Sequence, residues 1–358
     1  MIASRPQSRT ILIMAGGTGG HIFPALAVAE ELAARGWRVV WLGASGGMEG
    51  QIVPSYGYPV QWIRFGGLRG KGLLRFALLP LNLLIAFFQS ARVLFRVRPD
   101  VVLGMGGYVT FPGGMMAALF LRPLVIHEQN AVAGLANRVL AQVADHVLVA
   151  FPGVLPKSVW TGNPVRKAIA GLAPPEQRFA GRSGRLQLLV IGGSLGARVL
   201  NETMPRAVAL MPESVRPRLT HQSGRAHLQE LEVAYREAGI EARVVTFIEN
   251  MAGAYADADL VICRAGATTV AELAAAGVAS VLVPFPSAVD DHQTANARHL
   301  SDSGAAVLLP QSELTPRRLC DLLLGFTRER LLQMATRARA LGKPDAARQV
   351  ADCCEAAA

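Results

Sequence analysis

The chain has 358 residues, 51% of them hydrophobic, a length and composition that suit two domains with separate cores and exclude a disordered chain. Its formal net charge of +10 favours an anionic partner, while the 6% aromatic content and the lack of long basic runs argue against nucleic acid. The four cysteines form no CxxC spacing and the first ten residues lack an apolar signal-peptide core, so we expect a cytosolic protein.

The first predicted element is a buried strand at residues 11–14, which passes into the glycine-rich turn AGGTGG and then into helical periodicity. Such a turn brings backbone N–H groups and the positive end of a helix to one point, which suits a phosphate. A tight strand-to-helix turn without a ligand is the alternative. The turn is not the dinucleotide fingerprint, because His21 follows the glycines and no acidic residue ends a second strand at the usual distance.

The same pattern returns at residues 188–198, where LLVIGGSLGAR again joins a strand, two glycines, a hydroxyl residue and a helix. Two phosphate-type loops half a chain apart predict two Rossmann-like α/β domains with a ligand between them. We expect the first domain at residues 1–166 and the second at residues 167–343, with a linker at 171–183 where periodicity is poor. A last helix within residues 344–358 is expected to pack back on the first domain.

After a strand at residues 38–42 and a loop at 43–50, the most unusual segment is residues 64–98, which is basic at both ends and apolar between. Its apolar run is too short and too polar to cross a bilayer, but a helix there would carry one wide apolar arc beside basic residues, which is typical of a helix lying on an anionic membrane. A crossover helix buried in the fold is the alternative. The arc contains Leu74, Leu78, Leu81, Ile85 and Phe88, and its basic neighbours are Arg69, Lys71, Arg92 and Arg96.

Three further polar or glycine-rich clusters follow in the first half. A strand at residues 100–103 opens into a third glycine-rich loop, GMGGYVTFPGG, at 104–114. A strand at 123–126 ends in the four hydrogen-bonding side chains HEQN, where α/β folds place ligand contacts. A further polar cluster, TGNPVR, ends at Arg166.

In the second half, after a strand expected at residues 244–248, a strand at 260–263 runs into RAGATTVAEL, which places Glu272 in the first turns of a helix. A carboxylate there suits a pair of sugar hydroxyls, and complementing the helix dipole is the alternative. A strand at 280–284 is followed by FPSAVDDHQTANA, which crowds polar side chains at a helix start. No cysteine or histidine pair has ligand spacing, so polyol recognition is favoured over a zinc site.

Seven separated motifs that cover nearly the whole chain resemble the MurG family. They are, in order, GGTGGHIFPALA, GMGGYVTFPGG, HEQNAVAGLANR, GNPVR, GGSLGAR, CRAGATTVAEL and DHQTANA. That family comprises bacterial glycosyltransferases of the GT-B fold, which add N-acetylglucosamine from UDP-N-acetylglucosamine to lipid I, an undecaprenyl-diphosphate-linked muramyl pentapeptide. The resemblance therefore implies two Rossmann-like domains, a C-terminal donor site, an acceptor that approaches the N-terminal domain, and a peripheral position on the cytoplasmic face of the cell membrane.

The site residues that the resemblance implies are carried over motif by motif. The acceptor side would include Gly106, Gly107 and Tyr108. His21 is the candidate catalytic base, with Glu128 in reserve, and a role of His21 in capping a helix or binding a diphosphate is the alternative. Donor contacts would come from Thr18, Gly19, Gly20, Asn130, Arg166, Ser194, Ile248, Ala267, Thr268, Thr269, Val270, Ala271, Glu272 and Gln293.

Inverting transfer by this arrangement calls for no cofactor, and no DxD-type carboxylate pair ends a strand, so we expect no essential metal. Three rival functions are weighed against it. A nicotinamide dehydrogenase would need the missing acidic residue. A sugar-nucleotide epimerase of the same architecture would have no use for the apolar arc. A non-catalytic membrane scaffold would explain the arc but would have no use for the donor motifs.

Overall fold

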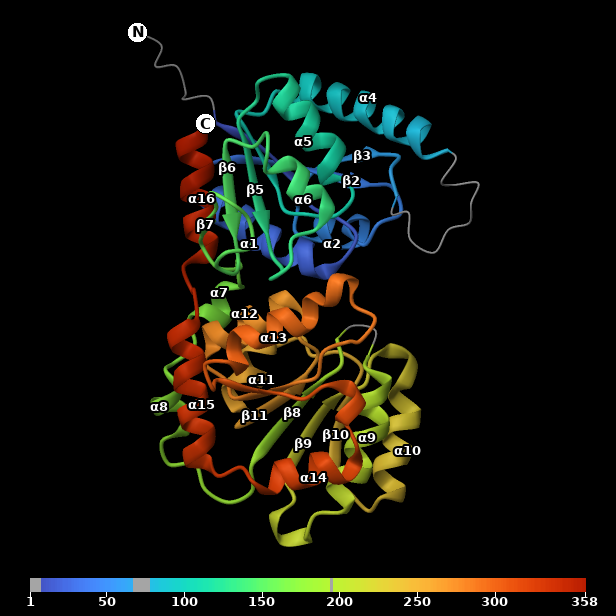
Figure 1. Ribbon diagram of the computed structural model, residues 1–358, viewed down its shortest axis with the longest axis vertical. Helices are drawn as coiled ribbons and strands as arrows, with labels where there is room; N and C mark the ends of the chain where they lie inside the picture. The colour runs from blue at the N-terminus through green and yellow to red at the C-terminus, as the bar shows by residue number, and fades with distance from the viewer. Residues whose placement is uncertain (1–7, 67–77, 194–195) are drawn as a thin grey trace. The chain divides into compact units, whose positions relative to one another are not determined.

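The computed structural model describes residues 8–66, 78–193 and 196–358. The chain divides into two compact units, Met1–Arg166 together with Asp345–Ala358, and Lys167–Pro344. Figure 1 colours the first unit blue to green with a red C-terminal helix, and the second green to red. Both are open parallel sheets with helices on their faces, so the predicted pair of Rossmann-like domains is confirmed.

The sheet of the N-terminal unit has the strand order β3-β2-β1-β4-β5-β6-β7, and every pairing in it is parallel. Its elements are β1 (Thr10–Met14), α1 (Gly19–Ala34), β2 (Arg38–Ala44), α2 (Glu49–Ser55), β3 (Val60–Ile63), α4 (Leu79–Val97), β4 (Val101–Gly104), α5 (Thr110–Leu119), β5 (Leu124–Glu128), α6 (Leu135–Leu140), β6 (His146–Val149), β7 (Val159–Trp160) and the last helix of the chain, α16 (Ala346–Ala357).

The C-terminal unit repeats this plan with the strand order β10-β9-β8-β11-β12-β13, again parallel throughout. Its elements are α7 (Lys167–Ala170), α8 (Pro175–Phe179), β8 (Gln187–Ile191), α9 (Arg198–Ala209), β9 (Arg218–Gln222), α10 (Leu228–Glu237), β10 (Ala242–Val245), α11 (Met251–Asp257), β11 (Leu260–Cys263), α12 (Ala267–Ala276), β12 (Ser280–Leu282), α13 (His292–Ser301), β13 (Ala306–Leu308), α14 (Pro316–Leu324) and α15 (Arg328–Leu341).

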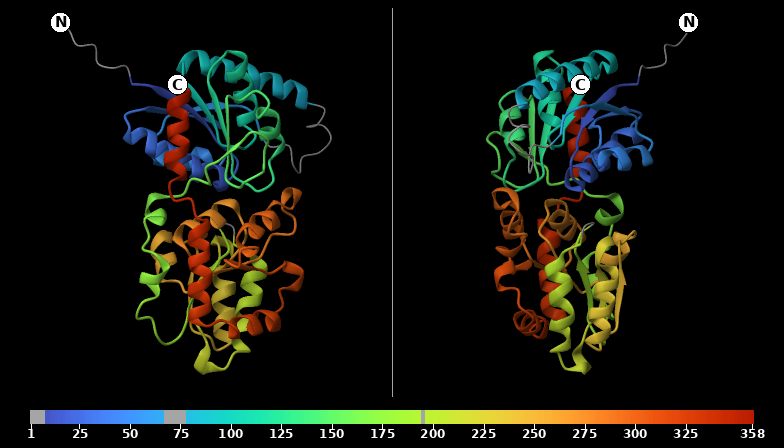
Figure 2. Two further views of the ribbon diagram at one scale, coloured as in Figure 1. Left: turned by 60° about the vertical axis from the view of Figure 1, so that its left-hand side comes forward. Right: turned by 90° about the vertical axis from the view of Figure 1, so that its right-hand side faces the viewer.

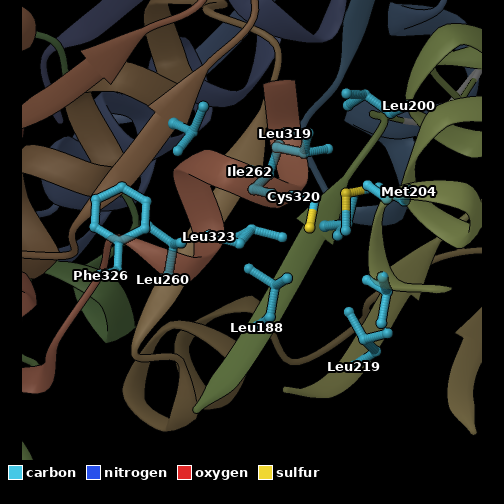
Figure 3. Packing of buried hydrophobic residues seen from close by; sticks show 14 of the residues in the cluster. Leu188, Leu200, Met204, Leu219, Leu260, Ile262, Leu319, Cys320, Leu323 and Phe326 are labelled. Atoms are coloured by element: carbon cyan, nitrogen blue, oxygen red, sulfur yellow. The ribbon is translucent and has the colours of Figure 1, made fainter. Parts of the chain in front are cut away.

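The central strands are apolar without interruption because helices cover both faces of each sheet. In β1, Ile11 and Ile13 belong to the core under α1 and α16, whereas Leu12 and Met14 point to the opposite core under α4 and α5. Figure 3 shows the corresponding core of the C-terminal unit, where Leu188 of β8 lies among side chains of α9 and α14. The strand cores predicted from apolar runs at β1, β2, β4, β5 and β11 are confirmed.

The last helix, α16, lies along the N-terminal unit, as the red helix beside the blue-green sheet in Figure 2 shows. Val350 and Cys354 are buried in the core that α1 shares with β1. At the rim of this contact, Arg35 pairs with Asp352 and Glu355, each at 2.7 Å, and Trp37 Nε1 donates to Glu355 at 3.0 Å. Apolar packing and an ion-pair cluster thus join the two ends of the described sequence into one unit.

The boundaries of several predicted segments were wrong, among them the strands expected at 123–126 and 280–284, which are β5 (Leu124–Glu128) and β12 (Ser280–Leu282). Strand β2 runs to Ala44 and α2 already begins at Glu49, so the loop expected at 43–50 is shorter, and β10 ends at Val245 rather than at 248. Residues 104–114 are not all loop, because α5 begins at Thr110. Gly113 and Gly114 lie inside this helix, where a Cβ would overlap Met14 and Leu140, so these glycines serve close packing rather than a turn.

The segment 171–183, predicted as a linker, is also structured. Helix α8 lies within it, and Phe179 is part of the core of the C-terminal unit. Arg178 donates to the carbonyls of Tyr255 at 3.0 Å and Ala276 at 2.8 Å. These hydrogen bonds from the guanidinium to main-chain carbonyls, one of them at the end of α12, hold the segment in place. The segment is therefore structured although its sequence shows no helical periodicity.

Helix α4 differs from the prediction in length and agrees with it in exposure. It extends to Val97, and among the described residues it meets the length and composition of a membrane-spanning helix. One face is occupied, because Ala86, Ser90, Val93 and Leu94 are buried as the helix packs on α5 (Figure 1). The opposite face exposes Leu78, Leu81, Leu84, Ile85, Phe88 and Phe95. The alternative of a fully buried crossover helix is therefore wrong, and Leu74 lies outside the described residues.

Candidate active site

The candidate site in the N-terminal unit lies where the carboxyl ends of three neighbouring strands meet. Met14 of β1 pairs with Gly104 of β4, and Gly104 in turn pairs with Ile126 of β5. Strands β1 and β4 are neighbours, yet the chain leaves β1 for β2 and returns, so this is the switch point at which doubly wound sheets bind ligands. The topology brings His21, the Tyr108 loop and Asn130 to this one edge.

The two glycine-rich loops at this edge touch each other. Gly107 adopts φ 87°, and a Cβ at this position would overlap the Gly16 carbonyl oxygen. Met105 N donates to Met14 O at 2.8 Å, and the Thr110 hydroxyl donates to Gly106 O at 2.8 Å. The glycine at 107 is therefore required twice, for its backbone conformation and for the contact.

Glu49 is a site residue that the sequence analysis missed. It is fully buried, and its carboxylate accepts hydrogen bonds from Gly17 N at 3.1 Å and Ala44 N at 2.9 Å. A Cβ at Gly16, Gly43 or Gly47 would press on this side chain, so these glycines form its pocket. The carboxylate occupies the Gly17 N–H, which the glycine-rich turn would otherwise offer to a phosphate. The signal in the sequence was an acidic residue flanked by glycines just after β2.

A chain of hydrogen bonds leads from His21 into the interior. His21 Nδ1 lies 2.8 Å from Gln129 Oε1, Gln129 Nε2 lies 3.0 Å from His127 Nδ1, and His127 Nε2 lies 2.9 Å from Gly162 O. Gly106 borders the first of these bonds, since a Cβ there would overlap His21 Nδ1. His127 is fully buried, and this burial lowers its pKa to about 4 despite opposing contributions from Gly162 and Glu128.

Glu128, the predicted reserve base, is 2% exposed and binds its own loop. Its carboxylate accepts from Asn130 N at 2.9 Å, Gly134 N at 3.1 Å and Asn137 Nδ2 at 2.8 Å. Three donors on two oxygens give this side chain the geometry of a brace for the loop after β5 rather than of a free base. Asn130, a predicted donor contact, is half-buried and positioned by that brace.

The remaining predicted residues of this unit differ in their exposure. Thr18 is exposed at the start of α1, with Gly19 and Gly20 partly exposed in the first turn. Tyr108 packs edge-on against Phe65 with ring centroids 6.4 Å apart, and partial burial, with a smaller effect of the Glu49 charge, raises the pKa of its hydroxyl. Arg166 is half-buried at the end of the unit.

In the C-terminal unit, the first turn of α12 follows β11 at the equivalent switch point between β8 and β11. Gly266 is the N-cap, and Thr268, Thr269 and Ala271 are partly exposed. Ala267 and Val270 are buried, and Val270 N donates to Gly266 O at 2.9 Å, so these two residues support the helix start. The partly exposed threonines lie at the positive end of α12, where a helix offers N–H groups to an anion.

Glu272 lies deeper than the sequence suggested. It is 6% exposed, and the buried Tyr255 hydroxyl donates to its Oε2 at 3.2 Å. The thiol of Cys263 is nearby, and its burial, with a smaller contribution from the Glu272 charge, raises its pKa to about 12. A carboxylate so placed is held in one position by its surroundings.

Gln293 and Arg264 brace the loop that follows β12. Gln293 Oε1 accepts from Phe285 N at 2.9 Å. Arg264, which the sequence analysis missed, donates to Val283 O at 3.2 Å and to Gln311 at 2.7 Å, and its guanidinium lies 5.3 Å from the centre of the Phe285 ring. The basic residue directly after β11 was the only sequence signal for this brace.

The second glycine-rich loop and Ile248 complete the predicted set. Ser194 lies outside the described residues, but Gly196 adopts φ 77° where a Cβ would overlap the Ser223 carbonyl, so this loop, like the first, needs its glycine for close contact. Ile248 lines a cavity of about 500 Å³ beside β8, β9 and β10, together with Phe247, Thr220 and Arg243. Within residues 8–66, 78–193 and 196–358, no group of three or more His, Cys, Asp or Glu side chains is placed to hold a metal ion.

Comparison with known proteins identifies the family. Residues 11–149 match the glycosyltransferase family 28 N-terminal domain, and residues 187–350 match its C-terminal domain. The chain is 62% identical over 351 residues to a protein of Nitrosospira multiformis named UDP-N-acetylglucosamine--N-acetylmuramyl-(pentapeptide) pyrophosphoryl-undecaprenol N-acetylglucosamine transferase, covering 97% of this chain and 98% of that one. A protein of Aromatoleum aromaticum with the same name is 64% identical over 97% of both chains. The crystal structure of Acinetobacter baumannii MurG matches with a TM-score of 0.86 and 41% identity, over 97% of this chain and 99% of that one.

The chain belongs to the MurG family of glycosyltransferases. The resemblance of its seven motifs and the GT-B fold are thereby confirmed. More distant structures share the architecture only. A UDP-N-acetylglucosamine 2-epimerase, for example, matches with a TM-score of 0.63 at 14% identity. Family membership makes this chain a glycosyltransferase and sets the frame for the roles of the residues described above.

The internal role of Glu49 generates a first prediction. Glu49→Ala should lower the free energy of unfolding of the N-terminal unit by about 2 to 4 kcal/mol, because the partly buried Gly17 N–H and the buried Ala44 N–H lose their acceptor. Urea unfolding followed by circular dichroism measures the change. Glu30→Ala, on the exposed face of α1, is the matched control and should be nearly neutral. An unchanged unfolding midpoint in Glu49→Ala would show that these N–H groups need no carboxylate.

Proposed function

We propose that the protein transfers N-acetylglucosamine from UDP-N-acetylglucosamine to the 4-hydroxyl of the muramyl sugar of undecaprenyl-diphosphate-linked lipid I, forming lipid II for peptidoglycan synthesis. The observation that carries the proposal is the match of the whole chain to transferases with this name at 62% and 64% identity. The exposed apolar face of α4 supports a lipid-linked acceptor as well, because a soluble nucleotide-sugar enzyme has no use for it.

The chemistry is a single displacement with inversion. The muramyl 4-hydroxyl oxygen forms a bond to the anomeric carbon, the bond from that carbon to the UDP phosphate oxygen breaks, and its electron pair leaves with UDP. His21 takes the hydroxyl proton. A neutral imidazole suits this step near pH 7, and a well-placed general base contributes roughly 10² to 10⁴ in rate. Gly106 borders His21, and with Gly107 and Tyr108 of the same loop it would receive the acceptor sugar.

Negative charge develops on the departing diphosphate, and backbone N–H groups can stabilise it without a metal. The first turn of α12, at Thr268 and Thr269, offers such groups. We assign the same stabilising role to the glycine-rich loop before α9 and to the Arg166 side chain. In the N-terminal unit, Glu49 already uses Gly17 N, so we assign phosphate contacts there to Thr18, Gly19 and Gly20 at the start of α1. Ile248 would contact the uracil end of the donor, and Gln293 would contact its sugar. Asn130 would contact the transferred N-acetylglucosamine.

The test of the function is an assay with labelled UDP-N-acetylglucosamine and a water-soluble lipid I analogue. We expect a β-1,4 disaccharide and UDP in equal amounts, and no product without acceptor. His21→Ala should slow single-turnover transfer by roughly 10² to 10⁴ while the donor dissociation constant stays within a few fold. Release of a 2-epimer, or hydrolysis in place of transfer, would contradict the assigned reaction, and a single-turnover rate equal to wild type would remove His21 as the base.

The assignment of Glu272 to the ribose hydroxyls is tested on UDP, which shares the ribose with the donor. Glu272→Ala should weaken UDP and UDP-N-acetylglucosamine alike, by about 2 to 4 kcal/mol, because two hydrogen bonds to a charged acceptor are lost. Tyr255→Phe is the matched control, since it removes the internal bond to Glu272 but leaves the carboxylate. Calorimetric titration measures both. Equal losses in the two variants would mean that Glu272 acts through the packing of α12, not through the nucleotide.

We further propose that the protein is peripheral to the cytoplasmic face of the membrane and that α4 lies on an anionic lipid surface. Leu81, Leu84 and Phe88 are 55%, 67% and 71% exposed, and Arg92 and Arg96 are exposed beside them. Because the opposite face of α4 is packed on α5, the helix would lie in the interface rather than cross the bilayer. Phe95 packs at a tilt against Phe120, with ring centroids 4.7 Å apart, and extends the apolar face toward the end of α5.

The apolar and basic groups of this surface should respond differently to salt. Leu81→Ser with Phe88→Ser should reduce co-sedimentation with anionic vesicles at every salt concentration, whereas Arg92→Gln with Arg96→Gln should flatten the salt dependence, because charges are screened over about 8 to 10 Å. Leu210→Ser with Val233→Ser, which alters exposed apolar residues of the C-terminal unit, is the control. Activity on the soluble acceptor should persist in all three variants. Vesicle binding that is insensitive to the first pair would contradict the proposal.

A further inference from the structure

Gln129 connects the catalytic candidate His21 to a buried histidine, His127. It follows β5 directly and is 1% exposed. Its amide lies between His21 Nδ1, 2.8 Å from Oε1, and His127 Nδ1, 3.0 Å from Nε2. The same Nε2 also lies 3.0 Å from the carbonyl oxygen of His127.

The two carbonyl groups in this cluster determine the direction of every hydrogen bond, because a carbonyl oxygen only accepts. The His127 carbonyl must face the NH₂ end of the Gln129 amide, which turns Oε1 toward His21. The Gly162 carbonyl, 2.9 Å from His127 Nε2, requires that this nitrogen carry the proton. In neutral His127, Nδ1 is then the acceptor, and it takes the second N–H of the Gln129 amide.

We propose that Gln129, oriented by His127, is a positioning residue that holds His21 in the tautomer with the proton on Nδ1, so that Nε2 carries the lone pair that receives the acceptor proton. Gln129 Oε1 can only accept, so His21 Nδ1 must donate to it. When His21 becomes protonated in the reaction, the same bond remains intact and stabilises the imidazolium. The kinetic part of this inference rests on the proposed function, whereas the tautomer does not.

The arrangement depends on a neutral His127. If His127 were protonated, its Nδ1–H would face the N–H of Gln129, donor against donor, and the amide would lose its orientation. Full burial keeps this histidine uncharged, since it lowers the pKa of His127 to about 4. Gly106 adds a steric constraint, because it leaves room for the bond between His21 and Gln129 where any Cβ would overlap His21 Nδ1.

The tautomer can be measured on the full chain without substrate. In protein labelled with ¹⁵N-histidine, long-range ¹H–¹⁵N spectra at pH 8 distinguish a protonated from an unprotonated ring nitrogen. We expect His21 with the proton on Nδ1 and His127 with the proton on Nε2. Gln129→Leu should shift His21 toward the Nε2–H form that free neutral histidine favours in water, and Gln142→Leu, at an exposed glutamine of the same unit, should not. A wild-type His21 with its proton on Nε2 would overturn the proposal, whether or not the protein is a transferase.

Kinetics then test whether Gln129 acts through His21. Gln129→Leu should lower kcat about 10- to 100-fold, with KM for the donor within a few fold, the range that loss of a supporting residue behind a catalytic group produces. In the His21→Ala background the same substitution should have almost no further effect, because its route of action is gone. Independent, multiplicative losses would show that Gln129 acts elsewhere and contradict the inference. A protein inactive on lipid I analogues would fail the proposed function but leave the spectroscopic test of the tautomer intact.

Discussion

The contact between Gly16 and Gly107 is the constraint on which the N-terminal site depends. The parallel register of β1 with β4 makes the two glycine-rich loops leave the same edge of the sheet, and they meet without any side chain between them. A side chain at Gly107 would overlap the Gly16 backbone and separate the loops, and one at Gly16 would overlap the Glu49 carboxylate. His21 lies in the first turn of α1, directly after the first loop, and Gly106 of the second loop lies against its ring. The position of the imidazole therefore follows from the contact between the two loop backbones.

Around this contact, buried polar groups are arranged to hold the loops still. Glu49 binds the N–H groups of Gly17 and Ala44, and Glu128 binds Asn130 and Gly134 of the loop after β5 and Asn137 of α6. In the C-terminal unit Gln293 and Arg264 act similarly on the loop after β12. The two buried carboxylates, Glu49 and Glu128, would cost free energy if left unpaired in the interior, so each one favours a single conformation of its loop. Preorganisation of this kind lets a site stabilise developing charge without rearranging during the reaction.

The same organisation separates partly exposed side chains from enclosed ones. His21, which follows β1, and His127, in β5, both carry ring nitrogens capable of base catalysis. His21 is partly exposed, whereas His127 is enclosed and uncharged. Glu128 is likewise enclosed by its own loop. The Glu128 carboxylate accepts hydrogen bonds from within its own unit, the geometry of a group that positions its surroundings.

The sequence by itself determined the two Rossmann-like units, because strands covered on both faces leave continuous apolar runs and glycine-rich turns mark where they end. It also placed His21, the α12 threonines and the exposed arc of α4, since local periodicity and motif spacing carry that information. Only the tertiary structure decided which partners meet. The pairing of Glu49 with Gly17, the bond between Gln129 and His21, the burial of Glu272 beside Tyr255 and the contacts of the helix inside residues 171–183 join residues that are separated in the chain. Such contacts are fixed by the register of the strands, and no local pattern of residues records them.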